Sequence, residues 1–282
     1  MSDVVNFPMN PLSPSASLTE ALNRHWKEYF MEAAEIAALM LGTCFFGTLV
    51  YSSDSPLNYL QIPPAAKPSL MGLGVAMTTF LIIKSPFGRR TGAHFNPAVT
   101  LTFFWLRRVH RWDAGCYVTA QFIGGVLGVM VAHELLGMHL SSAPVHYLVT
   151  IPGSRGKMFA FVGEFVLAGL LMGMVLYSSN HRRLVRFTPM LVALLTIFYY
   201  TLSPSIAGYS VNPARTFSSA VFAWIWYGIW IYFSAPFLGM MTAAAIYVRR
   251  TGSDHVYCAK VFHDIHTPCP FFCRFGTLIQ GQ

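Results

Sequence analysis

Two ten-residue stretches of this chain share a pattern: GAHFNPAVTL at residues 92–101 and GYSVNPARTF at residues 208–217. Asn-Pro-Ala occurs in both, and the two asparagines, Asn96 and Asn212, are 116 residues apart. Asparagine is a preferred N-cap of a helix. Proline is favoured at the first helical position, where no N–H is needed. Each stretch therefore predicts the start of a short helix, over 97–106 and over 213–223.

The composition is that of a membrane protein. Of the 282 residues, 54% are hydrophobic and only 11% are charged, which is typical of chains that cross a bilayer. The hydrocarbon core is roughly 30 Å thick and needs about 20 apolar residues per helix. Six apolar windows are interpreted as spans: 29–51, 69–83, 113–136, 159–178, 188–204 and 227–248. The second is the weakest and is kept because LMGLGVAMTTFLII holds no charge.

The two short helices are too short to span the bilayer and fall in the length class of re-entrant segments. Irregular backbone at membrane depth is tolerated only where it lines a water-filled cavity or is buried in protein. The segments that lead into the two Asn-Pro-Ala motifs are therefore expected to run along a pore. Their backbone carbonyls would replace lost hydration there. The predicted pore-lining backbone comprises Gly92, Ala93, His94, Gly208, Tyr209 and Ser210.

The order of segments indicates one unit used twice. Each half has two spans, a half-helix and a third span, over about 29–136 and 159–250. Because the number of spans per half is odd, the second half is inverted relative to the first. Each half also carries a glutamate early in its first span, Glu35 and Glu164.

Charge placement predicts the orientation. With both termini in the cytoplasm, all but four of the 19 Lys and Arg residues fall on the cytoplasmic side, as the positive-inside rule requires. This topology and anionic lipid explain the net charge of +8. A nucleic-acid partner is not indicated, because no basic face is interleaved with exposed aromatic residues. The four exceptions are Lys67, Arg155, Lys157 and Arg215.

Paired Asn-Pro-Ala motifs with these flanks, on an inverted six-span repeat, resemble the aquaporin and aquaglyceroporin (major intrinsic protein) family over residues 29–250. The resemblance implies an all-α, right-handed bundle of six transmembrane helices and two re-entrant half-helices. It also implies a homotetramer with one pore per protomer and no cofactor for conduction. Glu35 and Glu164 would then accept hydrogen bonds from the loops that carry the half-helices. Outside this region lie a cytoplasmic N-terminal tail (1–28) and a Cys/His-rich cytoplasmic tail (251–282).

The expected mechanism follows from the two half-helices meeting at mid-membrane. The side-chain amides of Asn96 and Asn212 would donate to a passing oxygen. The positive ends of both helix dipoles would repel a cation at the same place. Water would cross and protons would not. The predicted central motifs are Asn96, Pro97 and Ala98 in the first half, and Asn212, Pro213 and Ala214 in the second.

Selectivity is expected at a constriction made by four residues. Arg215 matches the filter arginine of the family, and its guanidinium donates several hydrogen bonds. Tyr209 matches the loop residue of the filter, Tyr200 its fifth-span member and Met71 its second-span member. Two tyrosines beside an arginine predict a narrow aperture, which favours water. Tyr209 also occurs here in some glycerol conductors, so a facilitator of glycerol or another small neutral solute stays as the alternative.

Other functions find less support in the sequence. The chain has no nucleophile elbow, phosphate loop or zinc-hydrolase helix, so an enzyme is not expected. A proton-coupled secondary transporter would need charged pairs within its spans, and the sequence does not indicate such pairs. A non-conducting membrane interaction protein would have no need of Asn96, Asn212 and Arg215, which are all present.

Two segments carry further hypotheses. The C-terminal tail places Cys258, His263, Cys269 and Cys273 within 16 residues, and clustered Cys and His in the cytoplasm indicate metal more often than disulfide. These four residues would suffice for tetrahedral zinc. The alternative is a tail with acylated or idle cysteines. In KSPFGRR, Ser85 is a candidate phosphorylation or gating site, although a solvated basic turn is the simpler interpretation.

Overall fold

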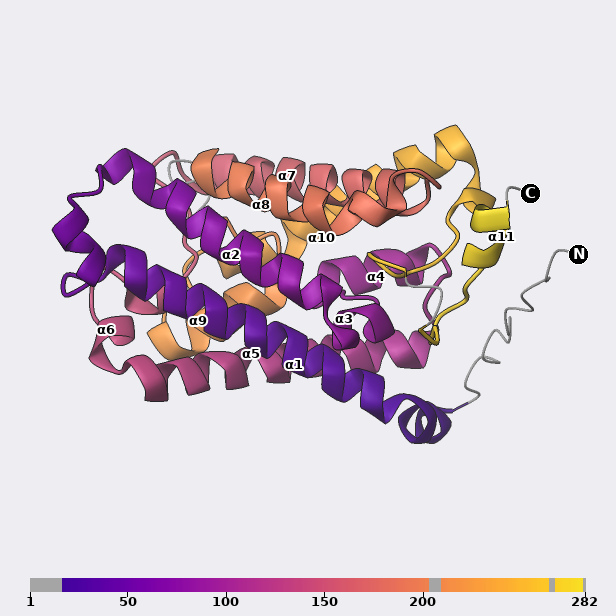
Figure 1. Cartoon of the computed structure of the whole chain (residues 1–282), viewed down its shortest axis with the longest axis horizontal. Helices are drawn as coiled ribbons and strands as arrows, with labels where there is room; N and C mark the ends of the chain where they lie inside the picture. Colours follow the sequence, from indigo (N-terminus) through magenta and orange to yellow (C-terminus); the bar gives the residue numbers. More distant parts are fainter. Residues whose placement is uncertain (1–16, 203–208, 264–266, 281–282) are drawn as a thin grey trace, which may run out of the picture.

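The computed structural model describes residues 17–202, 209–263 and 267–280. Its long helices run side by side along the longest axis of the molecule (Figure 1). α3, α11 and the start of α1 lie at one end, which we call the tail end. The connection from α1 to α2 and the short helix α6 lie at the opposite end, which we call the far end.

Helices account for all the regular secondary structure in these described ranges. The α-helices are α1 (Leu18–Tyr51), α2 (Lys67–Lys84), α3 (Pro86–Thr91), α4 (Pro97–Trp105), α5 (Arg111–Leu136), α6 (Met138–Ser141), α7 (Lys157–Ser179), α8 (Thr188–Leu202), α9 (Pro213–Ala223), α10 (Ile229–Thr251) and α11 (Phe275–Gln280). Short 3-10 helices are η1 (Pro56–Leu60), η2 (Pro64–Ala66), η3 (His146–Leu148), η4 (Val185–Phe187) and η6 (Ser253–His255).

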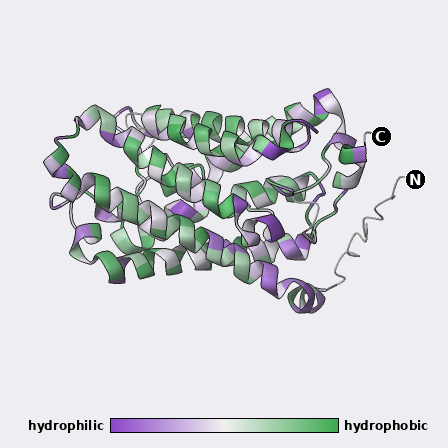
Figure 2. Cartoon of the chain, in the orientation of Figure 1, coloured by the Kyte–Doolittle hydropathy of each residue, from purple (hydrophilic) through white to green (hydrophobic). Residues whose placement is uncertain are grey.

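Among the described residues, six helices are long and apolar enough to cross a membrane, and each contains most of one predicted span. Hydrophobic residues cover these helices along their length (Figure 2). The first helix differs from the prediction, because it begins at Leu18, inside the segment expected to be a tail. The Ser17 side chain accepts a hydrogen bond from the N–H of Glu20 and so caps it. A non-helical backbone at His25 separates this amphipathic start from the span proper.

Close helix contacts are made by small residues in both halves. In the first half, a Cβ on Gly124 of α5 would lie 2.1 Å from the carbonyl oxygen of Ala33 in α1. A Cβ on Gly128 of α5 would lie 2.5 Å from the carbonyl oxygen of Ala37 in α1. In the second half, a Cβ on Gly239 of α10 would lie 2.1 Å from the carbonyl oxygen of Phe165 in α7. Because lipid offers no hydrophobic drive, such close backbone approach is a main source of helix association in membranes.

The half-helices α4 and α9 lie inside the bundle and occupy opposite ends of it (Figure 1). Their observed bounds, Pro97–Trp105 and Pro213–Ala223, agree with the predicted segments to within a residue. KSPFGRR differs from the expected turn: it forms the short helix α3, whose N-cap Ser85 accepts a hydrogen bond from the N–H of Gly88 at 3.0 Å.

The glycine contacts generate a stability prediction. Gly124→Ala places a methyl group against the α1 backbone, and we expect a loss of about 1–3 kcal/mol, the usual range for overpacking. Gly115→Ala is the matched control on the same helix, since its Cβ would meet nothing within 4 Å. The control should be neutral or slightly stabilising, because alanine favours helix over glycine. Thermal unfolding in detergent measures both. Equal melting temperatures for the two variants would contradict the packing argument.

Candidate pore and C-terminal metal cluster

Each half-helix begins at its asparagine because the side chain caps it. The Oδ1 of Asn96 accepts a hydrogen bond from the N–H of Ala98 at 2.9 Å. The Oδ1 of Asn212 accepts from Ala214 at 3.1 Å and from Arg215 at 3.3 Å. Both oxygens are thereby used for capping, which leaves the amide hydrogens for other partners.

The two asparagines also bind each other's loops. The Nδ2 of Asn96 donates to the carbonyl of Val211 at 2.9 Å, and the Nδ2 of Asn212 donates to the carbonyl of Phe95 at 2.8 Å. Each bond thus ends on the residue that precedes the opposite asparagine. An amide has two N–H donors, so each asparagine has a second hydrogen available to a molecule in the adjacent cavity.

The loops before the asparagines have the same unusual backbone in both halves. The residues one and three positions before each asparagine have positive φ: Phe95 at 30° and Ala93 at 55°, Val211 at 54° and Tyr209 at 41°. Such values are uncommon outside glycine, and for a β-branched residue such as Val211 they are outliers. Each costs on the order of 1–3 kcal/mol. The surrounding structure must therefore hold these loops in place.

In the second half, the carboxylate of Glu164 holds the loop. It is fully buried and accepts hydrogen bonds from the N–H groups of Ser210 at 2.8 Å and Val211 at 2.6 Å. In the first half, the counterpart is Glu32, which accepts from the N–H of Phe95 and from the Nε2 of Gln121.

Glu35, the residue singled out from the sequence, acts one step further away. It accepts from the hydroxyl of Thr91 at 2.6 Å, and that hydroxyl accepts from the N–H of Ala93 at 3.0 Å. The sequence did carry a signal for the missed Glu32, because it lies three residues before Glu35 and so shares its helix face.

Two cavities meet inside the bundle. The central cavity, about 70 Å³, contains both asparagines in its lining. The far-end cavity, about 400 Å³, opens among the loops of the far end. The lining residues common to both are Tyr200, Tyr209 and Arg215. The boundary between the cavities is therefore made by three of the four predicted filter residues, and Met71 lines the far-end cavity beside them.

The filter side chains are tightly arranged. The rings of Tyr200 and Tyr209 meet edge to face, with centroids 4.7 Å apart. Tyr200 packs closely against α2, since a Cβ on Gly72 would lie 2.8 Å from the Cβ of Tyr200. Arg215 is only 7% exposed, and its Nη1 has no hydrogen-bond partner within the described ranges. An arginine donor of this kind, in the lining of a cavity, is available to a passing solute oxygen.

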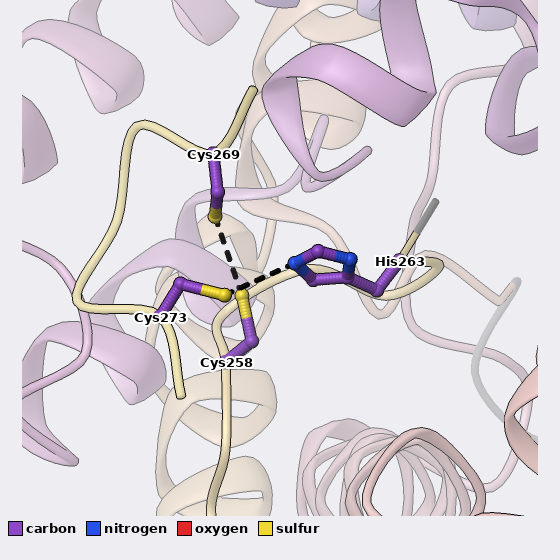
Figure 3. A group of neighbouring side chains, drawn as sticks. All are labelled: Cys258, His263, Cys269 and Cys273. Carbon is purple, nitrogen blue, oxygen red and sulfur yellow. Dashed lines mark hydrogen bonds between the residues drawn. The ribbon is translucent and has the colours of Figure 1, made fainter. Parts of the chain in front are cut away.

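The Cys/His residues of the tail come together at the tail end (Figure 3). One ligand atom from each of Cys258, His263, Cys269 and Cys273 lies within 4.8 Å of all the others. The sulfurs of Cys258 and Cys269 are 3.4 Å apart, well beyond the length of a disulfide, and all three cysteines are free. The Nε2 of His263 lies 3.1 Å from the sulfur of Cys273.

Burial and neighbouring groups shift the pKa values of the thiols of this cluster in opposite directions. Hydrogen bonds from Cys258 and Cys269 lower the pKa of Cys273 below the usual thiol range. Burial raises the pKa of Cys269 to about 12. A cation bound by the cluster would favour the deprotonated form of all three thiols.

Comparison with known proteins identifies the family. A profile of the major intrinsic protein family matches residues 24–247, most of the chain. The chain belongs to the major intrinsic protein family. Members of this family are membrane channels rather than enzymes, and they transport water and small solutes such as glycerol. The family and the six apolar helices together make the chain an integral, multi-pass membrane protein.

Individual relatives carry names of both branches of the family. A probable aquaporin NIP-type of Nicotiana alata is 30% identical over 185 residues, which are 63% of this chain and 66% of that relative. The match therefore spans slightly less than two thirds of it. Aquaporin Z of Photorhabdus laumondii is 26% identical and covers 76% of this chain and 95% of its own. The aquaglyceroporin structure from Plasmodium falciparum superposes with a TM-score of 0.62 at 20% identity, over 79% of this chain and 95% of its own.

The major intrinsic protein match ends before the C-terminal tail, and the tail changes the expected pore lining. The carbonyl of Gly92 accepts a hydrogen bond from the N–H of Val261 at 2.9 Å, so one of its two lone pairs is already used by the tail. The ring of His94 is buried, and its Nε2 donates to the carbonyl of Ala259 at 2.7 Å. This backbone partner is 165 residues away along the chain.

The rest of the predicted pore backbone divides into two groups. Ser210 lines the central cavity, together with Tyr209. Ala93 is buried and its N–H bonds to Thr91, whereas Gly208 lies outside the described residues. Of the predicted pore-lining residues that the structure describes, the two from the second-half loop line the cavities. Tyr209 lines both, and Ser210 lines the central one.

The hydrogen bonds from the second-half loop to Glu164 can be tested by substitution. Glu164→Gln replaces one acceptor oxygen by an NH₂ donor, which then faces a backbone N–H. An unsatisfied buried donor costs about 1–3 kcal/mol, and we expect a lower melting temperature in detergent. Glu134→Gln is the control, because Glu134 is exposed on α5. If both variants unfold at the wild-type temperature, the carboxylate does not hold the loop.

Proposed function

We propose that this channel conducts water along an osmotic gradient and excludes ions and protons. The observation that carries the proposal is the meeting of the two cavities at Tyr200, Tyr209 and Arg215, directly beside the paired asparagines. Conduction needs no cofactor in this account, because every donor and acceptor on the path belongs to the chain.

Exclusion of charge follows from the same groups. The N-terminal ends of α4 and α9 both face the central cavity, so their dipoles oppose a cation there. Arg215 adds a full positive charge at the filter. A water that accepts hydrogen bonds from Asn96 and Asn212 is oriented by them, and its oxygen can no longer relay a proton along a chain of waters.

The dimensions favour water over larger solutes. One water needs a cavity volume of roughly 10–15 Å³, so the central cavity of about 70 Å³ holds a short file of waters. The edge-to-face pair of Tyr200 and Tyr209 narrows the entrance from the far-end cavity. The alternative, a facilitator of glycerol or another small neutral solute, is favoured by the amphipathic wall that these rings present beside Arg215.

The topology and assembly are proposals of the same kind. We place both termini and the tail end in the cytoplasm, which the charge distribution supports. We also propose a homotetramer with one pore per protomer. Large apolar side chains exposed along the outer faces of the spans, such as Leu127, Leu170 and Leu194, support contact with lipid or a neighbouring protomer there.

Stopped-flow light scattering on proteoliposomes tests the substrate. We expect rapid water efflux under an impermeant osmolyte and slow glycerol entry. Tyr200→Ala widens the filter and should raise glycerol permeability roughly tenfold, equivalent to about 1.4 kcal/mol of barrier. Tyr177→Ala is the control, since Tyr177 is 61% exposed on the outer face of α7. Rapid glycerol entry through the wild-type protein would move it to the glycerol branch. Absence of any flux, both before and after removal of bound metal, would support a non-conducting protein.

A second proposal concerns the tail. We propose that Cys258, His263, Cys269 and Cys273 bind zinc, because their ligand atoms already lie within 4.8 Å of one another in a Cys₃His set. Zinc binding to such a set requires deprotonated thiols and a neutral histidine.

Metal analysis of the purified protein tests this directly. We expect about one zinc ion per chain in the wild type, as a closed four-ligand site requires. Cys273→Ser should lose most of it. Cys116→Ser is the matched control, because Cys116 lies in α5, outside the cluster. Equal zinc content in the two variants would show that the cluster is not the site.

A further inference from the structure

The C-terminal tail crosses the tail end from the second half of the molecule to the first. The N–H of Tyr257 donates to the Oδ1 of Asn180, at the end of α7, at 2.8 Å. The ring of Phe262 lies under the Nζ of Lys84, the last residue of α2, at 4.4 Å. The segment between these two anchors therefore reaches from the end of α7 to the end of α2.

Within this span, the tail binds the loop that leads to the first asparagine. Val261 donates to the carbonyl of Gly92, and the carbonyl of Ala259 accepts from the His94 ring. Phe271 stacks on the same ring, with centroids 5.2 Å apart and planes nearly parallel. The tail thus occupies backbone and side-chain groups of the loop whose second-half equivalent lines the central cavity.

Lys260 shows how deeply this segment is inserted. The residue is only 1% exposed, although lysine is almost never fully buried unless it is paired. Its Nζ donates to the carbonyls of Arg89 at 2.6 Å and Pro268 at 2.9 Å. One partner is in α3 and the other is in the tail, so Lys260 fastens the tail to the helix before the first Asn-Pro-Ala loop.

The loop does not depend on the tail for its position. Glu32 holds the N–H of Phe95, Thr91 holds that of Ala93, and Asn212 holds the carbonyl of Phe95. The tail contacts are added to a loop that is already fixed from the membrane side. They cover the loop from the tail side.

The four cluster residues bracket both inserted parts of the tail. Cys258 and His263 lie immediately on either side of residues 259–262. Cys269 and Cys273 lie two residues before and two residues after Phe271. A metal bound to all four closes each part into a short loop and so lowers the entropy of the released tail, which favours the bound arrangement.

We propose that zinc bound by Cys258, His263, Cys269 and Cys273 holds the tail as a cover over the tail-end mouth of the pore, and that loss of the metal opens the channel. The inference rests on the proposed channel and on the proposed zinc site. Zinc is a ligand that binds the covered state better than the open one and so shifts the population toward it.

Water flux through the full-length protein with and without metal tests the cover. Proteoliposomes are prepared with zinc, and a membrane-permeant zinc chelator is added to one half of the sample. Metal analysis of both halves confirms loading and removal. We expect chelation to raise water permeability about fivefold or more, the lower limit typical of coupled sites, and added zinc to reverse it.

Two variants separate the cover from the metal. Lys260→Met keeps all four ligands but loses the bonds to Arg89 and Pro268, so it should retain zinc and conduct near the chelated level. His255→Ala is the control, because its side chain is exposed and outside the cluster. It should behave as the wild type in both measurements.

The outcomes are distinct. Unchanged or lower flux after verified zinc removal would overturn the cover and would mean that the tail is inert or supports the loop. Absence of zinc from the wild-type protein would overturn the metal site, and with it the inference. Absence of flux in every state, including Lys260→Met, would contradict the channel proposal itself.

Discussion

The reciprocal pair of hydrogen bonds between Asn96 and Asn212 and the opposite loops is the constraint on which the pore depends. Each asparagine caps its own half-helix with its oxygen and binds the other half with its nitrogen. The two short helices are therefore fixed relative to one another at the centre of the bundle, although neither spans it. Arg215 follows directly in α9, so the same bonds place the filter.

This arrangement requires buried carboxylates. Ionisable groups are rare within membrane-spanning segments because they are costly to place there. The loops adopt positive φ at Phe95 and Val211, and these backbones persist only where the surroundings over-determine them. Glu32 and Glu164 supply that determination, because each accepts the N–H of one of these residues. A carboxylate that satisfies a strained loop is a structural group, and its place at the first span of each half follows from the inverted repeat.

Local signals in the sequence predicted the half-helices well. Asn-Pro predicts both an N-cap and a first helical residue. The observed helix starts at Pro97 and Pro213 confirm this prediction. The six spans followed from length and hydropathy. The role of Glu32 and the burial of His94 against the tail were missed, because both depend on contacts between residues more than 60 positions apart. The spacing of Glu32 from Glu35 indicated their shared helix face but not the loop that Glu32 binds, and the tail that buries His94 lies beyond the family match.

The most direct test of the central claim measures water and proton movement in the same vesicles. Proteoliposomes containing a trapped pH indicator are subjected to an osmotic step and then to a pH step, beside protein-free vesicles. The account predicts water efflux well above that of the protein-free vesicles and proton leak equal to theirs. Proton leak that rises together with water flux would contradict a path on which Asn96, Asn212 and Arg215 orient each water and repel charge.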